Sequence, residues 1–365
     1  MEKETASSGA ENMKTAIIEI GGSHDECLYS QIKFLKSVDN SHVTLICDEK
    51  IKNRVDYFNL VDETHVVKIR KGFREFIDLY KLRKFLISGG FNKVIFNTAQ
   101  GSRIKKLLFF PYTKQIEFIG VLHNIKKLNG SFSQKQISKK VRKYFILNDY
   151  LLEEIEQKNM KALDIGTFYP IFFPEYPELA LEKKEDEIWV CVPGQVELKR
   201  RDYECLFNSI EKTGIADNVK LILLGRCEHP SGDGAYIKEK LETLNIKNNF
   251  LIWDDFVDTD LFYHYIKHAD FILPLIHPDH KSFVLYKNQI SGAFNLAFGY
   301  KKPLLMEATY SRYDDFKNNS IFYDKENIFE VINSLELNHN KDSYNEKKWT
   351  FEYQSDRYLE LINKV

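Results

Sequence analysis

The sequence predicts an α/β protein with two Rossmann-like, doubly wound domains that face a central cleft. Three observations support this fold class. Short runs rich in Val, Ile and Phe alternate with segments of helical spacing along nearly the whole chain, the pattern of βα units in a parallel sheet. A proline-rich break near the middle divides the alternation into two series. A chain of 365 residues also exceeds the length that one core usually supports.

The first series predicts an N-terminal domain over residues 14–170, after a polar leader at 1–13 that we expect to be mobile. Its strands are apolar and rich in β-branched residues, and they are expected at Thr15–Ile20, His42–Cys47, Thr64–Ile69, Lys93–Phe96, Glu117–Leu122 and Tyr144–Leu147. The helices between them are expected near 25–37, 73–88, 100–110 and 149–158.

Three prolines within eight residues mark a linker over 171–187, and a second domain is expected over 188–346. Its predicted strands are Ile188–Val192, Val219–Leu224, Asn249–Trp253, Phe271–Leu275, Lys302–Met306 and Ser320–Tyr323, with helices after the first five. Ligands of open α/β sheets bind at the carboxyl ends of the strands. The residues that follow these strands are therefore the first candidates for a binding site.

The composition and the N-terminal sequence argue against several classes of protein. A net charge of -1 argues against general nucleic-acid binding, and five scattered cysteines without a CxxC pair fit reduced thiols in the cytoplasm. The N-terminus lacks the apolar core of a signal peptide, and no run of about 18 apolar residues occurs. We therefore expect a cytoplasmic protein that does not span a membrane.

A first anion-binding candidate follows the strand Ile188–Val192. Gly194 lets a ligand approach the backbone, and Lys199, Arg200 and Arg201 are expected in the opening turns of the next helix. Cations repel the positive end of a helix, so their presence there is explained by a bound anion. The alternative is a solvated basic turn beside Glu197 and Asp202.

A second candidate is the apolar helix that Ser291 and Gly292 begin and Gly299 ends. Small residues and free N–H groups at a helix start suit a diphosphate. A Ser that merely caps a core helix is the alternative, although it leaves Gly292 unexplained.

Motifs in a particular order carry a family resemblance. They are Gly21-Gly22-Ser23 after the first strand, Gly120-Val-Leu-His123-Asn, Phe145-Ile-Leu-Asn-Asp-Tyr, the basic turn at Lys199-Arg200, Leu224-Gly-Arg226, and Ala297-Phe-Gly-Tyr-Lys-Lys-Pro303. In this order, over nearly the whole chain, they resemble the GT-B glycosyltransferases, particularly the family 4-like group.

The resemblance implies a role for each matching residue. Lys199 and Arg200 correspond to the cation pair on the donor diphosphate, which Gly194, Ser291 and Gly292 also approach. Gly21, Gly22, Ser23, Arg226 and Asn295 are implied near the donor sugar, and His123 in the reaction centre. The segment 347–365 resembles the helix that crosses back onto the N-terminal domain. One departure is that Asn295 or Leu296 stands where the family has the second Glu of its Glu-x7-Glu motif.

The implied chemistry requires no metal, because fixed cations and helix N–H groups can stabilise the departing diphosphate. His123 would hydrogen-bond the reacting sugar or phosphate; the alternative is a histidine that satisfies a strand-end backbone group. Asp258-Thr-Asp260 matches a DxD metal motif, yet its position favours a helix cap. His264 and His268 have i,i+4 spacing without an obvious third ligand. The loop His277–His280 is a further candidate for contact with the donor sugar.

A basic stretch suggests a membrane partner. Residues 101–147 contain eleven Lys or Arg against one acid, Glu117, whereas 251–280 holds six Asp and one Lys. With Leu107–Phe110 beside these charges, the N-terminal domain is expected to rest on anionic lipid at the inner face of the membrane. The alternative is an ordinary solvated basic face with Leu107–Phe110 in the core.

The sequence and this resemblance thus predict a metal-independent glycosyltransferase that uses no cofactor, and the resemblance alone implies a retaining reaction. It would move a sugar from a nucleoside diphosphate to a glycan or lipid-linked acceptor in polysaccharide biosynthesis. One alternative is a nucleotide-sugar epimerase, which would need more carboxylates for proton transfer. Another is a catalytically inactive GT-B-like protein that binds glycans or partners.

Overall fold

The computed structural model describes residues 13–112, 115–155, 163–180, 182–228, 233–337 and 343–364, so that all but the last residue of the expected leader lies outside the described residues. The chain forms two compact units. The first comprises 1–146, 156–168 and 354–365, and the second comprises 147–155 and 169–353. Residues 147–155, expected in the N-terminal domain, thus belong to the second unit.

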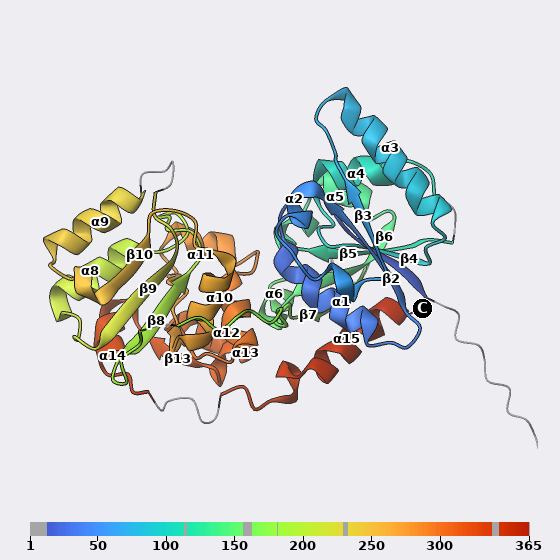
Figure 1. The fold of residues 1–365 in the computed structure, drawn as a ribbon. Coiled ribbons are helices and arrows are strands. Elements are labelled where there is room, and N and C mark those ends of the chain that lie inside the picture. The colour runs from blue at the N-terminus through green and yellow to red at the C-terminus, as the bar shows by residue number, and fades with distance from the viewer. Residues whose placement is uncertain are drawn as a thin grey trace, which may run out of the picture. The chain divides into compact units, whose positions relative to one another are not determined.

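The first unit contains a seven-stranded sheet with helices on both sides (Figure 1). Its strands are β1 (Lys14–Glu19), β2 (His42–Asp48), β3 (Glu63–Val67), β4 (Lys93–Phe96), β5 (Glu117–Leu122), β6 (Val141–Leu147) and β7 (Asp164–Phe168). Its helices are α1 (Leu28–Lys36), α2 (Glu49–Lys52), α3 (Phe73–Ser88), α4 (Gly101–Phe109), α5 (Phe132–Ile137) and most of α15 (Phe351–Asn363).

The strand order is β3-β2-β1-β4-β5-β6-β7, and β1 pairs in parallel with both β2 and β4. The chain therefore reverses its direction of winding between β1 and β4. In open α/β sheets this switch point is the usual place for a ligand, beyond the carboxyl ends of the strands. The segments after β1 and β4 are consequently the first place to look for functional residues.

The last helix, α15, packs on this first sheet. Tyr358 is fully buried, stacks on Phe145 with ring centroids 4.3 Å apart, and contacts Phe34 and Phe168. Its hydroxyl donates a hydrogen bond to Gln31 Oε1 at 3.0 Å. The end of the chain thus completes the core of the unit in which the chain began.

The second unit has a six-stranded sheet of β8 (Ile188–Pro193), β9 (Val219–Arg226), β10 (Phe250–Trp253), β11 (Phe271–Ile272), β12 (Leu304–Glu307) and β13 (Ser320–Tyr323). Its helices are α6 (Asp149–Glu153), α8 (Tyr203–Thr213), α9 (Asp233–Thr243), α10 (Thr259–His268), α11 (Lys281–Tyr286), α12 (Gly292–Gly299), α13 (Asp314–Lys317) and α14 (Ile328–Asn333).

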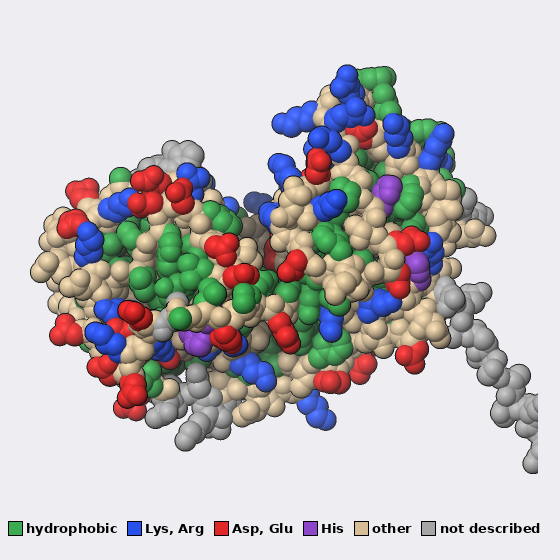
Figure 2. Space-filling view, viewed as in Figure 1, with side chains coloured by type: hydrophobic (Ala, Val, Ile, Leu, Met, Phe, Trp, Pro, Cys, Tyr) green, Lys and Arg blue, Asp and Glu red, His purple; other side chains and the backbone are tan. Residues whose placement is uncertain are grey.

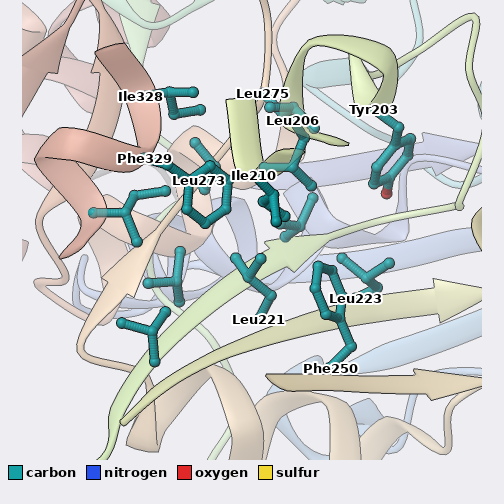
Figure 3. Packing of buried hydrophobic residues seen from close by; sticks show 14 of the residues in the cluster. Tyr203, Leu206, Ile210, Leu221, Leu223, Phe250, Leu273, Leu275, Ile328 and Phe329 are labelled. Atoms are coloured by element: carbon teal, nitrogen blue, oxygen red, sulfur yellow. The ribbon is translucent and has the colours of Figure 1, made fainter. Parts of the chain in front are cut away.

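The order β10-β9-β8-β11-β12-β13 repeats the topology of the first unit, with a switch point between β8 and β11. Every strand pair whose register is described in this sheet is parallel. One face of this sheet packs on α8 and α14. Between them lies a buried hydrophobic cluster that includes Leu206 and Ile210 of α8, Leu221 of β9 and Phe329 of α14 (Figure 3). This core fixes the strand ends that carry the candidate site.

Two local differences from the sequence predictions matter for the site. The helix after β8 begins at Tyr203, with Asp202 as its N-cap, so Lys199, Arg200 and Arg201 lie in the preceding turn and not in the helix. Strand β7 was not predicted. Among the described residues, no helix combines the length and apolar character that crossing a membrane requires.

Candidate active site

In the first unit, Glu19 connects the chain segments that meet at the switch point between β1 and β4. It ends β1, is 1% exposed, and accepts hydrogen bonds from Asn97 Nδ2 at 2.8 Å and from Thr98 Oγ1 at 2.6 Å. Its second oxygen accepts from the backbone N–H of Gly21 at 2.6 Å. Burial raises the pKa of Glu19, although its three donors oppose this shift. Glu19 therefore holds together the segments that follow β1 and β4.

The glycine loop after β1 is built around this carboxylate. A Cβ on Gly21 would lie 2.8 Å from Glu19 Oε1, and Gly22 has a φ of +73°, which side chains rarely adopt. Arg103 donates to the carbonyl of Ile20 at 3.0 Å, and Arg54 to that of Gly22 at 3.0 Å. Ser23 is exposed. The loop is thus fixed by its neighbours, and Ser23 faces solvent.

His123 follows β5 at the same sheet edge and is 5% exposed. Its Nε2 donates to the carbonyl of Asn97 at 2.7 Å, so the neutral ring keeps its lone pair on Nδ1. Burial, with repulsion from His24, lowers the pKa of His123 to about 4. The hydrogen bond to a strand-end backbone group, which the sequence offered as the alternative role, is present, and the ring is also neutral at physiological pH.

His24 stacks on His123 with ring centroids 3.8 Å apart. Its Nδ1 lies 3.2 Å from Glu26 Oε1, and its backbone has a φ of +66°. Although burial opposes the shift, the hydrogen bond and charge of Glu26 raise the pKa of His24. Strained backbone of this kind often occurs at functional sites. The two stacked rings therefore differ in proton affinity, as an acid–base pair requires.

In the second unit, the carboxyl end of β8 is closely packed. A Cβ on Gly225 of β9 would lie 2.1 Å from the carbonyl oxygen of Gly194, whose own φ is +102°. Arg201 is 4% exposed and donates to the carbonyls of Pro193 and Pro274. It therefore joins the ends of β8 and β11, and it is not a phosphate ligand as the sequence suggested.

Lys199 and Arg200 are the accessible cations of this turn. Both pair with buried Glu197, through Oε2 at 3.3 Å from Lys199 Nζ and 2.8 Å from Arg200 Nε. Arg200 also interacts electrostatically with Tyr286 at the end of α11. This contact brings the basic turn to the segment that leads into α12.

Helix α12 packs against β8 and β11, with Ser291 at its N-cap position. Ser291 makes no capping hydrogen bond, which excludes the simple capping role. The Ser291 hydroxyl (1% exposed) and Asn295 Oδ1 (4% exposed) are two of the thirteen buried side-chain polar atoms that have no hydrogen-bond partner among the described residues. A Cβ on Gly292 would meet no atom within 4 Å. The helix start thus combines open space, unpaired polar atoms and a positive dipole end.

The structure therefore brings the predicted residues together in two sets. Gly21, Gly22, Ser23 and His123 lie at the carboxyl edge of the first sheet, and Gly194, Lys199, Arg200, Arg226, Ser291, Gly292 and Asn295 belong to the second unit, where Arg226 ends β9 and is exposed. Sequence reasoning missed Glu19, Asn97, Thr98, His24 and Glu26. An acid inside the apolar run of β1 and polar residues directly after β4 were the available signals.

The other polar motifs have structural partners. His277 is fully buried. Its Nδ1 lies 2.8 Å from Asp202 Oδ2 and its Nε2 lies 3.0 Å from the Tyr323 hydroxyl, so both ring nitrogens have protein partners and do not contact a donor sugar. Although burial opposes the shift, the hydrogen bond from His277 lowers the pKa of Asp202. Asp258 caps α10 through the N–H of Asp260, as expected.

Two groups of described residues lie close enough to share a metal ion: Glu178 with His264 and His268, and Asp202 with Cys205 and His277. In the first group, Glu178 also pairs with Lys267, and His264 Nδ1 accepts from the N–H of Leu179 at 3.2 Å. In the second, both ring nitrogens of His277 are hydrogen-bonded. Both groups therefore have roles that require no metal.

Comparison with known proteins gives no matching family model and no matching curated protein. Solved structures do match. A glycosyltransferase from Rickettsia africae has 11% identity and a TM-score of 0.62, covering 98% of this chain and 100% of that one. A putative UDP-N-acetylglucosamine 2-epimerase from Listeria monocytogenes has 12% identity and a TM-score of 0.61, covering 97% and 96%. Anabaena Alr3699/HepE in complex with UDP and glucose has 12% identity and a TM-score of 0.60, covering 95% of each chain.

These similarities confirm the predicted fold class: two α/β domains with parallel sheets, as in enzymes of the GT-B type. At 11–12% identity they concern the fold alone. The resemblance to family 4 stays a prediction.

Proposed function

We propose that this chain is a nucleotide-sugar enzyme that binds the diphosphate of its substrate at the start of α12. The observation that carries the proposal is the pair of buried, unpartnered polar atoms, Ser291 Oγ and Asn295 Oδ1, beside the open face of Gly292. Buried polar atoms without partners are rare in folded proteins, and a ligand that supplies their partners explains them. An anion at a helix N-terminus is further stabilised by the free N–H groups.

The charges of the same edge suit a diphosphate. Lys199 and Arg200 share the single carboxylate of Glu197, which leaves one net positive charge in the turn. Both side chains are accessible, at 59% and 44% exposure, so they can turn toward a ligand. Arg226 at the end of β9 adds a further exposed cation. These cations make a metal unnecessary in the proposed chemistry.

For the reaction, we propose epimerisation of the sugar. In one balanced route, a base removes the proton from the carbon next to the anomeric centre, and the electron pair of that C–H bond forms a C=C bond as the anomeric C–O bond breaks and the diphosphate leaves. Re-addition of the diphosphate then takes up a proton on the opposite face, so the route uses one group that removes a proton and a second that returns one. The His24–Glu26 pair and the neutral ring of His123 are candidates for these two roles. UDP-N-acetylglucosamine 2-epimerases also recur among the similar solved structures, which supports this choice.

Glycosyl transfer is the second candidate. The order of motifs from Gly21 to Pro303 favours it, as do the similar structures described as a glycosyltransferase and as a complex with UDP and glucose. In this case the acceptor would be a glycan or a lipid-linked sugar in polysaccharide biosynthesis, with retention implied by the family resemblance. A chain that binds the nucleotide sugar without turnover is the third candidate.

The test is incubation of the protein with single nucleotide sugars in D₂O, without acceptor, followed by proton NMR. Candidate substrates are those whose nucleotide raises the melting temperature, since ligands that bind only the native state stabilise it. An epimerase that works by proton abstraction yields the epimer with deuterium at the inverted carbon.

Each result decides between the candidates. Deuterated epimer that is lost in a His24→Gln variant supports the proposal. An unchanged donor that is consumed only when a glycan acceptor is added supports glycosyl transfer. If no nucleotide or nucleotide sugar stabilises the protein, the proposed function is wrong.

A further inference from the structure

Helix α3 has two apolar faces, of which only one is covered. Leu79, Leu82 and Leu86 are buried against the first unit. On the opposite side, Phe73, Phe76, Ile77 and Tyr80 follow i, i+3, i+4, i+7 spacing and therefore form one stripe. All four are exposed, Phe73 at 81%. An uncovered aromatic stripe of this kind marks an interaction surface.

Basic residues border this stripe. Residues 68–84 contain seven Lys or Arg against two acids. Both acids are paired on the side away from the stripe, Asp78 with Arg70 and Glu75 with Lys106 and Arg103. Lys84 and Arg83 lie over the ring of Tyr80, at 5.0 Å and 5.8 Å from its centroid. The outer face of α3 is therefore apolar and cationic together.

Neighbouring helices extend the same surface. Lys106 of α4 lies 5.1 Å from the ring centroid of Phe76. Tyr80 contacts Phe110, which contacts Phe109, and Phe109 is 85% exposed. On α5, exposed Phe132 lies below Lys105. Figure 2 shows Lys and Arg side chains gathered with hydrophobic ones in the region of α3 and α4. We call this surface, from Phe73 to Phe132, the α3–α5 patch.

We infer that the α3–α5 patch is a docking surface for an anionic lipid bilayer. The positive charge of the patch favours an anionic partner, and its exposed aromatic rings favour a partner that also has an apolar region. An anionic bilayer offers both, because headgroup phosphates attract Lys and Arg while rings such as Phe and Tyr enter the interface. The inference is independent of the proposed enzymatic function.

The structure changes where lipid contact is expected. Within 101–147, Leu107 and Leu108 are buried, and buried Lys143 pairs with Glu117, so these residues are not available to lipid. Phe109 is exposed, and Lys105 is half-buried over the ring of Phe132. Four of the exposed apolar side chains of the patch, Phe73, Phe76, Ile77 and Tyr80, lie on α3, which precedes the basic stretch.

The test is flotation of the full chain, without nucleotide, on vesicles of phosphatidylcholine alone or with 30 mol% phosphatidylglycerol. Binding is expected only to the anionic vesicles and is expected to weaken as salt is raised. The Phe73→Ser/Phe76→Ser variant should lose at least about tenfold in partition coefficient, because two side chains no longer enter the interface. Lys81→Gln and Lys84→Gln should each cost about fivefold.

Phe256→Ser is the matched control, because Phe256 is 83% exposed in the second unit and lies outside the patch. It should bind vesicles like the wild type. All these side chains are exposed, so the melting temperature should not change. Binding equal to neutral and anionic vesicles, or equal losses in the Phe256 control, would overturn the inference. So would a wild type that does not bind but self-associates through Phe73 and Phe76.

A second measurement does not depend on loss of binding. A Phe73→Trp variant on anionic vesicles that contain brominated lipid should show stronger quenching of its fluorescence than the wild type. Of the three wild-type tryptophans, Trp189 and Trp349 are buried, and half-buried Trp253 belongs to the second unit and lies outside the patch. Equal quenching in the two proteins would contradict insertion of α3.

Discussion

At the scale of single residues, the pKa values of the two stacked histidines, His24 and His123, are shifted in opposite directions. His123 is buried and lies beside His24. Burial and repulsion from the charge of His24 both disfavour the charged form of His123. His24 lies against Glu26, which favours the charged form of His24 despite burial. Because the rings are only 3.8 Å apart, a proton on one ring raises the cost of a proton on the other. As the pH falls, the pair therefore takes up its first proton on His24.

This difference predicts the order of titration. By NMR of the ring nuclei, His24 should titrate above 6.5, the usual value for histidine, and His123 near 4. The native state should lose the stability contributed by neutral His123 as the pH falls from about 6.5 toward 4. The contribution of charged His24 should be present below about 6.5 and lost as the pH rises through its raised pKa.

A Glu26→Gln variant should lower the pKa of His24, because the carboxylate that favours its charge is gone. His123 should stay below its usual value, since burial is the larger cause of its shift. Glu63→Gln is the matched control, because Glu63 lies 3.7 Å from a different histidine, His42. Titration of His123 before His24 as the pH falls from 8 would contradict this account.

At the scale of elements, α12 carries two glycines with opposite physical roles. Gly292 stands in open space at the start of the helix. Gly299 ends the helix where a Cβ would lie 2.4 Å from the carbonyl oxygen of Ile171. The first position thus leaves room for a ligand, and the second allows the segment after β7 to approach closely.

We expect the same substitution at these positions to separate binding from stability. Gly292→Ala should keep the melting temperature or raise it, since Ala is the better helix former, and should weaken diphosphate binding by occupying the ligand's space. Gly299→Ala should lower the stability by about 1–3 kcal/mol through overpacking. Differential scanning fluorimetry with and without nucleotide measures both effects. A Gly292→Ala protein that binds the nucleotide like the wild type would be evidence against the proposed site.

The elements themselves were largely predictable. Alternating apolar and amphipathic runs place β1, β2, β4, β5 and α3 within one or two residues of their observed bounds. The turn after β8 was not predictable in this way, because Asp202 begins α8 next to Arg201, which hydrogen-bonds the carbonyls of Pro193 and Pro274 at the ends of β8 and β11. These hydrogen bonds depend on two strands about 80 residues apart in sequence, and local spacing carries no information about them.

At the scale of the whole molecule, the chain builds each unit from non-contiguous segments. The first unit is closed by residues 354–365, and the second takes 147–155 from the first series. Tyr150 shows how the latter segment is held, because its backbone N–H donates to buried Asp315 Oδ2 at 3.1 Å. Because residues 354–365 complete the first unit, the stability of that unit depends on the far end of the chain.

Loss of the Tyr358 side chain should accordingly destabilise the first unit. Tyr358→Ala removes a fully buried ring and is expected to cost about 3–5 kcal/mol in the free energy of unfolding, measured with urea. Tyr353→Ala on the same helix should change it by no more than about 0.5 kcal/mol, because Tyr353 is exposed. Equal effects of the two variants would mean that α15 does not complete the core.

The candidate site was only partly predictable at this scale. Lys199, Arg200, Ser291 and His123 follow strands that the sequence predicts, so the rule for open α/β sheets finds them. Glu19 and His24 escaped prediction because their roles come from contacts with Asn97, Thr98 and His123, which lie in the turns after β4 and β5. Buried hydrogen bonds between distant strands leave no periodic pattern in a sequence.

The central claim is that the second unit binds a nucleoside diphosphate through α12 and its basic turn. Isothermal titration with UDP, GDP and ADP tests it most directly, on the wild type, on Lys199→Gln/Arg200→Gln, and on the control Lys238→Gln, a residue of α9 that pairs with Glu228 and Asp254. We predict that one nucleotide binds the wild type and the control equally, and the double variant at least about tenfold more weakly, as expected for lost hydrogen bonds to a charged group. Absence of binding to the wild type at about 1 mM nucleotide, about -4.1 kcal/mol of binding free energy, or equal affinity in all three proteins would contradict the claim.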